Sequence, residues 1–235
     1  MHSTTLRPPI LHTGALLATR EKKRKKVQRV DLSRLFGQKQ EREVAEKRLD
    51  GRDRLPPGQY HTKKWPILTY EPTPKFDPRA YRFKVWGAVE HPFELRWEEL
   101  LNLPRVQLTA DFHCVTTWSR YDNTWEGVHI REILRRAEPT ADAQYVMVHS
   151  FTNYTTNLPL MSLDDEDVLI AFKHDGDELE PQHGGPVRLI VPKLYAYKSA
   201  KWLSGLEFLP ADRPGFWEIR GYSNSADPWK EERYW

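Results

Sequence analysis

The 235-residue sequence has only one cysteine, Cys114, so no disulfide can form within the chain and nothing indicates an oxidising compartment. It also lacks any apolar run approaching the ~20 residues that a membrane-spanning helix needs. Near the N-terminus the positive cluster follows the apolar patch at residues 15–18, which is the reverse of a secretory signal. We therefore expect a cytoplasmic protein with no membrane span.

Tryptophan is absent from the first 64 residues, although the chain contains nine. Residues 1–54 hold 15 Lys/Arg and 7 Asp/Glu (net +8), whereas residues 55–235 hold 21 and 26 (net −5). This contrast predicts a flexible basic arm at 1–54, with one short helix at 36–49, and a folded domain at 55–235. The acidic domain has no nucleic-acid footprint, so we expect no nucleic-acid partner. Contact of the arm with a membrane or nucleic acid is the alternative.

Short strands outnumber short helices in the apolar pattern of the domain, which predicts an α+β fold rich in β-structure. Strands are expected at residues 81–87, 106–113, 145–151, 168–173 and 187–191, with a hairpin turn at 174–177. Helices are expected at 96–103 and 128–137, and a capping box at 162–165.

The expected strand before Cys114 alternates apolar Val106, Leu108, Ala110 and Phe112 with polar residues, and this alternation continues to Cys114. Cys114 can therefore be a small buried hydrophobe, as many free cysteines are. It can also be a thiolate ligand at a strand end. One sulfur cannot hold zinc or an iron–sulfur cluster, but it can supply one ligand to a metal held mainly by a cofactor.

Three stretches of the sequence, in order, resemble the sulfite oxidase family of molybdopterin-binding oxidoreductases. They are His113-Cys114-Val-Thr-Thr-Trp118-Ser119 with Trp125-Glu-Gly127-Val128, then His183-Gly-Gly-Pro-Val-Arg188, then Lys198-Ser-Ala-Lys201-Trp202. The resemblance implies a β-rich mixed-sheet fold and an enzyme that uses molybdenum-molybdopterin. It also implies that the Cys114 thiolate is the catalytic metal ligand, since soft thiolates suit a redox metal.

The same resemblance suggests which residues bind the cofactor. Two glycines before Arg188 allow close backbone approach to a ligand, and a guanidinium matches a phosphate bidentately. In relatives, the positions that match Ser199, Ala200 and Lys201 bind the pterin phosphate. The full set of expected cofactor-binding residues is His61, Lys64, Trp65, Ser150, His183, Arg188, Ser199, Ala200 and Lys201. A tight turn with surface side chains is the plain alternative for each loop.

The substrate is less defined by the sequence. A pocket could be lined by His113, Trp118, Arg120, Tyr121 and Asn153. Sulfite oxidases follow the cysteine with an arginine pair that holds the anion, whereas Val-Thr-Thr-Trp follows it here. The pattern is as near to the methionine sulfoxide reductase branch as to the sulfite oxidase branch. The expected substrate is therefore a small molecule that can contain sulfur.

The expected activity is oxygen-atom transfer with an external electron-transfer partner, because the cofactor changes oxidation state in each turnover. The alternative is a non-catalytic molybdopterin-binding or structural module in which Cys114 is merely buried. The aromatic segment at residues 214–229 is expected to clamp onto the core as a structural tail, or else to form a rim of the active site.

Overall fold

The computed structural model describes residues 54–235. The predicted basic arm and its helix at 36–49 therefore lie, apart from Arg54, outside the described residues. Within the described part of the chain, no helix is both long enough and apolar enough to cross a membrane.

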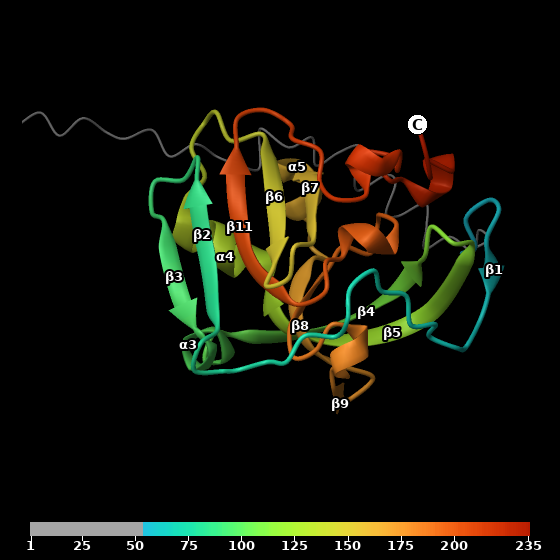
Figure 1. The fold of residues 1–235 in the computed structure, drawn as a ribbon, viewed down its shortest axis with the longest axis horizontal. Coiled ribbons are helices and arrows are strands. Elements are labelled where there is room, and N and C mark those ends of the chain that lie inside the picture. Colours follow the sequence, from blue (N-terminus) through green and yellow to red (C-terminus); the bar gives the residue numbers. More distant parts are fainter. Residues whose placement is uncertain (1–53) are drawn as a thin grey trace, which may run out of the picture.

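Two β-sheets form this domain, and the long strands β4 and β5 run across the strands of the second sheet (Figure 1). The first sheet has the order β1–β5–β8–β10, with β4 also paired to β5 and β9 to β8. Its strands are β1 (Tyr60–His61), β4 (Arg105–His113), β5 (Trp118–His129), β8 (Leu169–His174), β9 (Asp177–Glu178) and β10 (Arg188–Ile190).

The second sheet has five strands in the order β3–β2–β11–β6–β7. They are β2 (Arg82–Gly87), β3 (Phe93–Arg96), β6 (Tyr145–Ser150), β7 (Thr155–Pro159) and β11 (Leu203–Leu209). Strand β11 runs parallel to β2 and antiparallel to β6. Both sheets mix parallel and antiparallel pairs, which confirms the predicted β-rich mixed-sheet fold.

Three short α-helices connect the strands: α3 (Trp97–Leu101), α4 (Ile130–Ala137) and α5 (Leu160–Leu163). Helix α3 confirms the helix predicted near residue 96. The predicted helix at 128–137 begins too early, because Val128 and His129 still pair with β8. His129 then caps α4 by accepting a hydrogen bond from Arg131 N at 3.1 Å.

The capping box predicted at residues 162–165 is wrong. Ser162 lies inside α5, and Asp164 ends that helix as its C-cap residue. The helix sits there because Leu160 and Leu163 are both buried in the core, so packing and not a local polar motif decides where it starts.

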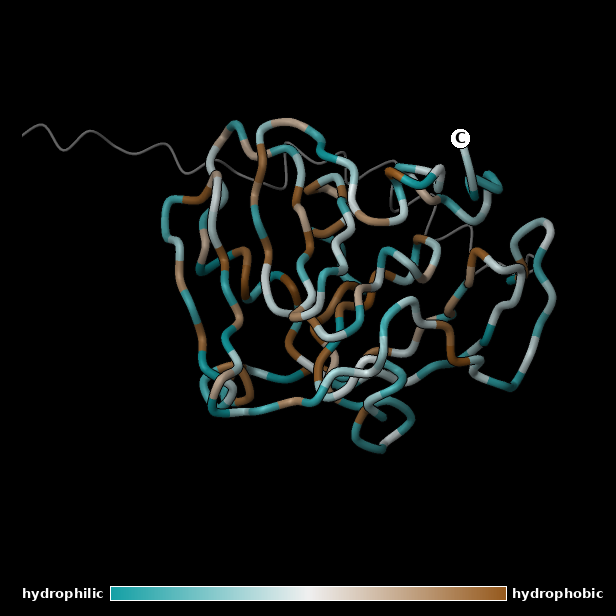
Figure 2. Tube along the Cα trace, viewed as in Figure 1, coloured by the Kyte–Doolittle hydropathy of each residue, from teal (hydrophilic) through white to brown (hydrophobic). Residues whose placement is uncertain are grey.

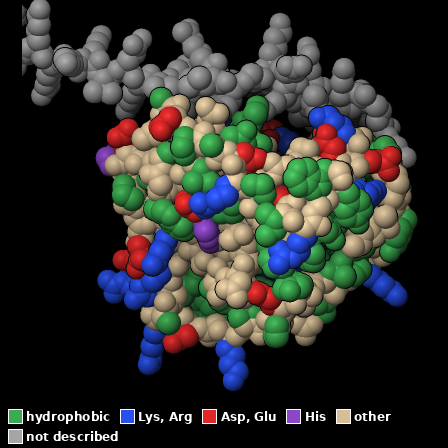
Figure 3. Space-filling view, turned by 45° about the horizontal axis from the view of Figure 1, so that its top comes forward, with side chains coloured by type: hydrophobic (Ala, Val, Ile, Leu, Met, Phe, Trp, Pro, Cys, Tyr) green, Lys and Arg blue, Asp and Glu red, His purple; other side chains and the backbone are tan. Residues whose placement is uncertain are grey.

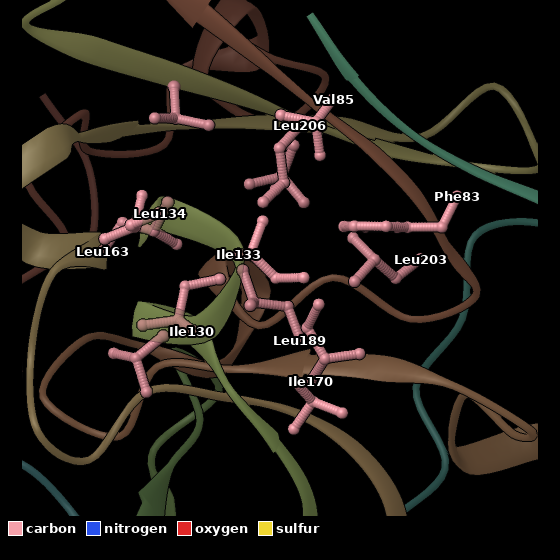
Figure 4. Packing of buried hydrophobic residues seen from close by; sticks show 14 of the residues in the cluster. Phe83, Val85, Ile130, Ile133, Leu134, Leu163, Ile170, Leu189, Leu203 and Leu206 are labelled. Carbon is pink, nitrogen blue, oxygen red and sulfur yellow. The ribbon is translucent and has the colours of Figure 1, made fainter. Parts of the chain in front are cut away.

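A hydrophobic core fills the space between the two sheets, and α4 and α5 close it (Figure 4). Ile133 of α4 lies between Leu206 of β11 and Leu189 of β10, and Leu134 lies beside Leu163 of α5. Figure 2 shows the most hydrophobic segments gathered around this core, while the end of the molecule around β1 is mostly polar. This core covers one face of the first sheet, and a second hydrophobic cluster packs on the other face.

Strand β10 shows how the two faces of the first sheet differ. Val187, Leu189 and Val191, in and beside the strand, belong to the core between the sheets. Ile190 packs on the opposite face with Trp125 and Phe112, and Arg188 lies over the same rings. The expected alternation of Arg188 with its apolar neighbours is confirmed. The first sheet thus separates an apolar core from a second, aromatic region around Cys114.

Candidate active site

Cys114 lies in the tight turn that joins β4 to β5. Backbone hydrogen bonds close this turn, from Cys114 N to Trp118 O (2.8 Å) and from Thr117 N to Cys114 O (3.1 Å). Thr117 has a left-handed φ of 78°, which completes the chain reversal. Burial raises the pKa of the Cys114 thiol, and hydrogen bonds from Thr116 oppose that rise.

The Cys114 side chain lines a cavity of about 360 Å³. Eight of the ten residues predicted to bind the cofactor or the metal lie around this cavity. They are Trp65, Cys114, Ser150, His183, Arg188, Ser199, Ala200 and Lys201. These residues come from segments far apart in the sequence, so the fold itself assembles the site.

The loop before β10 brings backbone close to the cavity. A Cβ on Gly185 would lie 1.9 Å from Leu179 O, so only glycine fits there. Gly184 adopts a left-handed φ of 104° and packs against the side chain of Lys201. This tight passage places His183 on one side and Arg188 on the other side of the cavity wall.

Arg188 is the most unusual charge in the site, because it is only 2% exposed. Its guanidinium donates to His183 O (2.7 Å) and to Ser199 O (2.8 Å). No ion pair to Arg188 occurs among residues 54–235. Burial lowers the pKa of Arg188 to about 9. A buried cation held only by carbonyl groups is a ready partner for an anionic ligand.

The segment at residues 199–201 forms the neighbouring part of the wall. Ser199 Oγ accepts a hydrogen bond from Val191 N at 2.9 Å. Lys201 Nζ donates to Leu68 O (2.8 Å) and Gln182 O (2.7 Å). Burial, with the nearby charge of Arg188, lowers the pKa of Lys201 to about 7. The cavity thus has a second cation whose partners in the described chain are carbonyl groups.

Trp65 and His183 form a stacked pair at the same wall. Their rings lie 3.9 Å apart at 11°, and His183 Nε2 donates to Trp65 O at 3.2 Å. Burial lowers the pKa of His183, although Glu180 favours the charged form. Ser150 Oγ donates a hydrogen bond to Lys201 O, which ties the 199–201 segment to the end of β6.

Several predicted residues do not reach this cavity. His61 is exposed and stacks on Tyr121 at 4.4 Å, and Lys64 is also exposed. Of the residues predicted to form a substrate pocket, only Trp118 lines the cavity. His113 is buried against Ser119, Arg120 pairs with Asp175, and Asn153 is exposed.

Two further walls complete the cavity: sequence reasoning missed the first and gave the second as the rim alternative for the aromatic segment at 214–229. One is residues 66–71, which include Leu68 and Tyr70, and the other is residues 216–222, which include Phe216, Trp217 and Tyr222. We call residues 211–222 the strap. The Tyr70 and Phe216 rings meet at 4.6 Å, so the two walls touch. The aromatic content of the tail was the signal, and the tail is both a clamp and a rim.

Lys198 precedes the segment at residues 199–201 that is predicted to bind the cofactor, but its side chain points away from the cavity. It is fully buried and donates to Glu218 Oε1 at 2.6 Å and to Asn157 O at 2.8 Å. Thr156 Oγ1 also donates to Glu218 Oε1 at 2.6 Å. This buried ion pair fixes the strap to β7, which explains why the strap stays over the cavity.

Residues 70–217 match the family described as the oxidoreductase molybdopterin binding domain. This match spans more than half of the chain. The chain belongs to this family of molybdopterin-binding oxidoreductases.

Its relatives include both branches suggested by the sequence. The Bacillus subtilis (strain 168) protein named uncharacterized oxidoreductase YuiH is 41% identical over 186 residues, 79% of this chain and 94% of that protein. The Campylobacter jejuni protein-methionine-sulfoxide reductase catalytic subunit MsrP is 28% identical, over 61% of this chain and 54% of its own. Human mitochondrial sulfite oxidase is 28% identical, over 66% of this chain and 34% of its own.

The solved structure of the sulfane dehydrogenase SoxCD from Paracoccus pantotrophus has the same fold, with a TM-score of 0.55. It is 21% identical, and the match covers 63% of this chain and 42% of that chain. These findings confirm the resemblance to the sulfite oxidase family. This chain nevertheless spans only part of MsrP, sulfite oxidase and SoxCD, so their complete activities do not transfer with the family.

The cavity of this molybdopterin-binding oxidoreductase fits the group its family name implies. Arg188 is a buried cation and Lys201 a half-buried one, both donate to carbonyl groups, and a molybdopterin brings a phosphate. Trp118 is one of the lining residues, and its buried indole N–H has no hydrogen-bond partner in the described chain. The residues present therefore offer donors to an anionic, acceptor-rich ligand, and Cys114 adds a soft sulfur.

Proposed function

We propose that this protein is a molybdenum-molybdopterin enzyme that transfers an oxygen atom from or to a small neutral sulfur compound, with a separate electron partner. The observation that carries the proposal is Arg188, buried at 2% exposure without a carboxylate partner among residues 54–235, beside the cavity that Cys114 lines. A charge in that state is unfavourable unless a ligand complements it.

The chain's own residues have distinct tasks in this proposal. The Cys114 thiolate binds molybdenum, and the cofactor supplies the change of oxidation state that accompanies oxygen transfer. Arg188 and Lys201 would hold the phosphate of the cofactor, and the stacked rings of Trp65 and His183 would form an apolar wall for the pterin. The strap excludes water by covering the cavity with Phe216 and Trp217.

The cavity favours a neutral substrate over sulfite. Arg188 and Lys201 are the lysine and arginine side chains among its lining residues, and both bond to backbone carbonyls in its wall. The other lining residues include Thr116, Tyr70, Trp217 and Tyr222, which carry no charge at neutral pH. A dianion would therefore meet no cation that the cofactor leaves available.

The exposed surface near the cavity is apolar as well. Ile67, Leu68 and Tyr70 are 47%, 49% and 64% exposed, and Ile219 of the strap is 65% exposed. Figure 3 shows hydrophobic side chains gathered on one face between scattered charges. Such an approach suits a substrate with an apolar substituent. The name of the relative MsrP points to the same class, because it describes a reductase of methionine sulfoxide.

An electron partner is required by the balance of the reaction. A sulfoxide gains two electrons and two protons to give a thioether and water, so one S–O bond breaks. The electrons must come from another molecule in each turnover. The relative MsrP is named a catalytic subunit, which supports a partner protein in this role.

The test is a comparison of wild type with Cys114→Ser, both produced in a molybdate-supplied host. We expect the wild type to contain molybdenum and to reduce methionine sulfoxide with a reduced viologen dye, faster than it oxidises sulfite with ferricyanide. We expect Cys114→Ser to fold but to turn over neither substrate, since serine replaces a soft ligand with a hard one.

Thr117→Ser, which keeps a hydroxyl in the same turn, is the matched control and should keep full turnover. Equal turnover in Cys114→Ser and wild type would contradict the ligand assignment. A wild type without molybdenum would instead favour the alternative, a module in which Cys114 is merely buried. Faster sulfite oxidation would contradict the neutral-substrate proposal and leave the enzyme class intact.

A further inference from the structure

Thr116 is the polar side chain that contacts the candidate metal ligand. Its Oγ1 lies 3.1 Å from Cys114 Sγ, and the residue is exposed at the wall of the cavity. The proposed function uses Cys114 itself but gives Thr116 no task beyond lining the cavity. The contact is short enough to be a hydrogen bond that involves sulfur.

The direction of this hydrogen bond follows from the chemistry of a bound thiolate. A cysteine that binds a metal has lost its proton, so its sulfur can only accept a hydrogen bond. The threonine hydroxyl keeps its proton and can donate it. In the metal-bound state the pair is therefore Thr116 Oγ1–H donating to Cys114 Sγ.

The turn that carries this pair is held from outside. Arg233 Nη1 donates to Val115 O at 2.8 Å, and Gln59 Nε2 donates to Cys114 O at 3.1 Å. Arg233 also lies over the Tyr195 ring at 5.0 Å. Backbone carbonyls on both sides of the turn are thus fixed, and a β-branched threonine has few side-chain rotamers. The hydroxyl is placed before any ligand arrives.

We propose that Thr116 is a positioning residue that donates a hydrogen bond to the metal-bound Cys114 thiolate and thereby raises the reduction potential of the metal. The hydrogen bond draws electron density from the sulfur, so the thiolate donates less to the metal and the reduced state becomes more favourable. Hydrogen bonds to ligand sulfurs set potentials in this way in other thiolate-bound metal centres. The inference rests on the proposed function.

Two substitutions separate this role from a structural one. Thr116→Val keeps the shape of the side chain and removes the donor, whereas Thr116→Ser keeps the donor and removes a methyl group. Thr117→Val is the matched control, because it removes the neighbouring hydroxyl, which donates to Thr116 O at 2.6 Å. Each variant is purified as the full chain with its cofactor, and its molybdenum content is measured first.

The readout is a redox titration followed by the electron paramagnetic resonance signal of Mo(V), together with the thiolate-to-molybdenum absorption band. We expect Thr116→Val to keep its molybdenum, to titrate at more negative potentials, and to show the absorption band at longer wavelength. Thr116→Ser and Thr117→Val should match the wild type in both measurements.

Two results would overturn the inference while the proposed function stands: unchanged potentials in Thr116→Val, or an equal shift in Thr116→Ser. An equal shift in Thr117→Val would also overturn it, since it would assign the effect to the turn as a whole. A wild type without molybdenum or a Mo(V) signal would overturn the proposed function, and this inference with it.

Discussion

The first sheet separates two regions whose buried residues follow opposite rules. Between the sheets the core is apolar, and Ile133, Leu189 and Leu206 fill it without any charge. On the other side of the first sheet, the wall of the cavity buries Arg188 at 2% exposure, and Lys198, next to the 199–201 wall segment in sequence, is buried at 0%. The apolar side chains of the first region need only one another as packing partners, whereas the buried charges of the second region need polar or charged partners.

The two buried cations in the second region differ from each other in an instructive way. Lys198 has a carboxylate partner, Glu218, at 2.6 Å. Arg188 donates to carbonyl groups, lies over aromatic rings, has no carboxylate partner among residues 54–235, and faces a cavity. A buried charge can therefore serve either the stability of the fold or the binding of a ligand. Lys198 completes the fold, and Arg188 prepares a site for a ligand that the chain does not supply.

The largest expected effect comes from breaking the pair that completes the fold. Lys198→Met leaves the Glu218 carboxylate buried without its cation, and we expect a loss of about 3–5 kcal/mol in the free energy of unfolding. Urea titration of wild type and variant in the same cofactor state measures it. Cofactor content should fall as well, because the strap is anchored through Glu218.

The double variant Lys198→Met with Glu218→Gln is the matched control. It removes both charges, so most of the lost stability should return. If the double variant is as unstable as the single one, packing around Lys198 matters more than its charge.

Smaller effects on stability and on cofactor binding are expected from substitutions at two neighbouring residues of β10. Leu189→Ala opens a cavity in the apolar core, and we expect a loss of about 2–5 kcal/mol of stability with the molybdenum content of the folded protein unchanged. Arg188→Met should change the stability of the cofactor-free protein little, because removing a buried charge without a carboxylate partner offsets the lost hydrogen bonds to His183 O and Ser199 O. It should weaken cofactor binding by about 1.5–3 kcal/mol, since it removes a charge-assisted hydrogen bond.

Molybdenum per folded protein and urea unfolding check both variants. Full molybdenum occupancy in Arg188→Met would show that the guanidinium serves the loop and not the cofactor. A large loss of occupancy in Leu189→Ala would show that the two faces of the sheet are not independent.

The difference between the two faces of the first sheet could be predicted where apolar and polar residues alternate along one strand. Val187, Arg188 and Leu189 alternate in type, so the opposite faces of β10 could be assigned from the sequence. Strand β5 was not predicted, because Asp122 adopts a left-handed φ of 55° and the polar Asn123 is buried, which interrupts the alternation of apolar and polar residues. Strand β11 was also missed, since Gly205 interrupts it where the Trp86 ring approaches.

The candidate site was predictable where short motifs carry it. Cys114, His183, Arg188 and Lys201 came from such motifs and lie around one cavity. The strap was expected from its aromatic residues as a clamp or a rim, but its anchor was not predictable, because that anchor is a long-range contact between Lys198 and Glu218. His61 was assigned to the cofactor by position alone, and the structure places it outside the cavity, against Tyr121.

The smallest expected effect concerns pH on the cavity side of the sheet. His174, at the end of β8, lies against Trp65 (4.2 Å) and Trp125 (4.4 Å). Burial lowers the pKa of His174 to about 4, and the charges of Arg120, Arg188 and His183 act in the same direction, while Asp175 opposes them. The folded protein therefore holds this imidazole neutral at a pH where the unfolded chain protonates it.

The sign follows from proton binding in the two states. Below the ordinary histidine pKa of about 6.5 the unfolded chain binds a proton that the folded state does not, so stability falls as the pH drops from about 6.5 to about 4. We expect a loss of about 1–2 kcal/mol from this group, less than a fully buried ring would give, because water reaches part of it. His174→Gln should remove that slope, and His91→Gln, at an exposed histidine, should leave it unchanged. Urea unfolding at several pH values decides: an undiminished slope in His174→Gln would place the pH dependence in other groups of the cavity wall, such as His183.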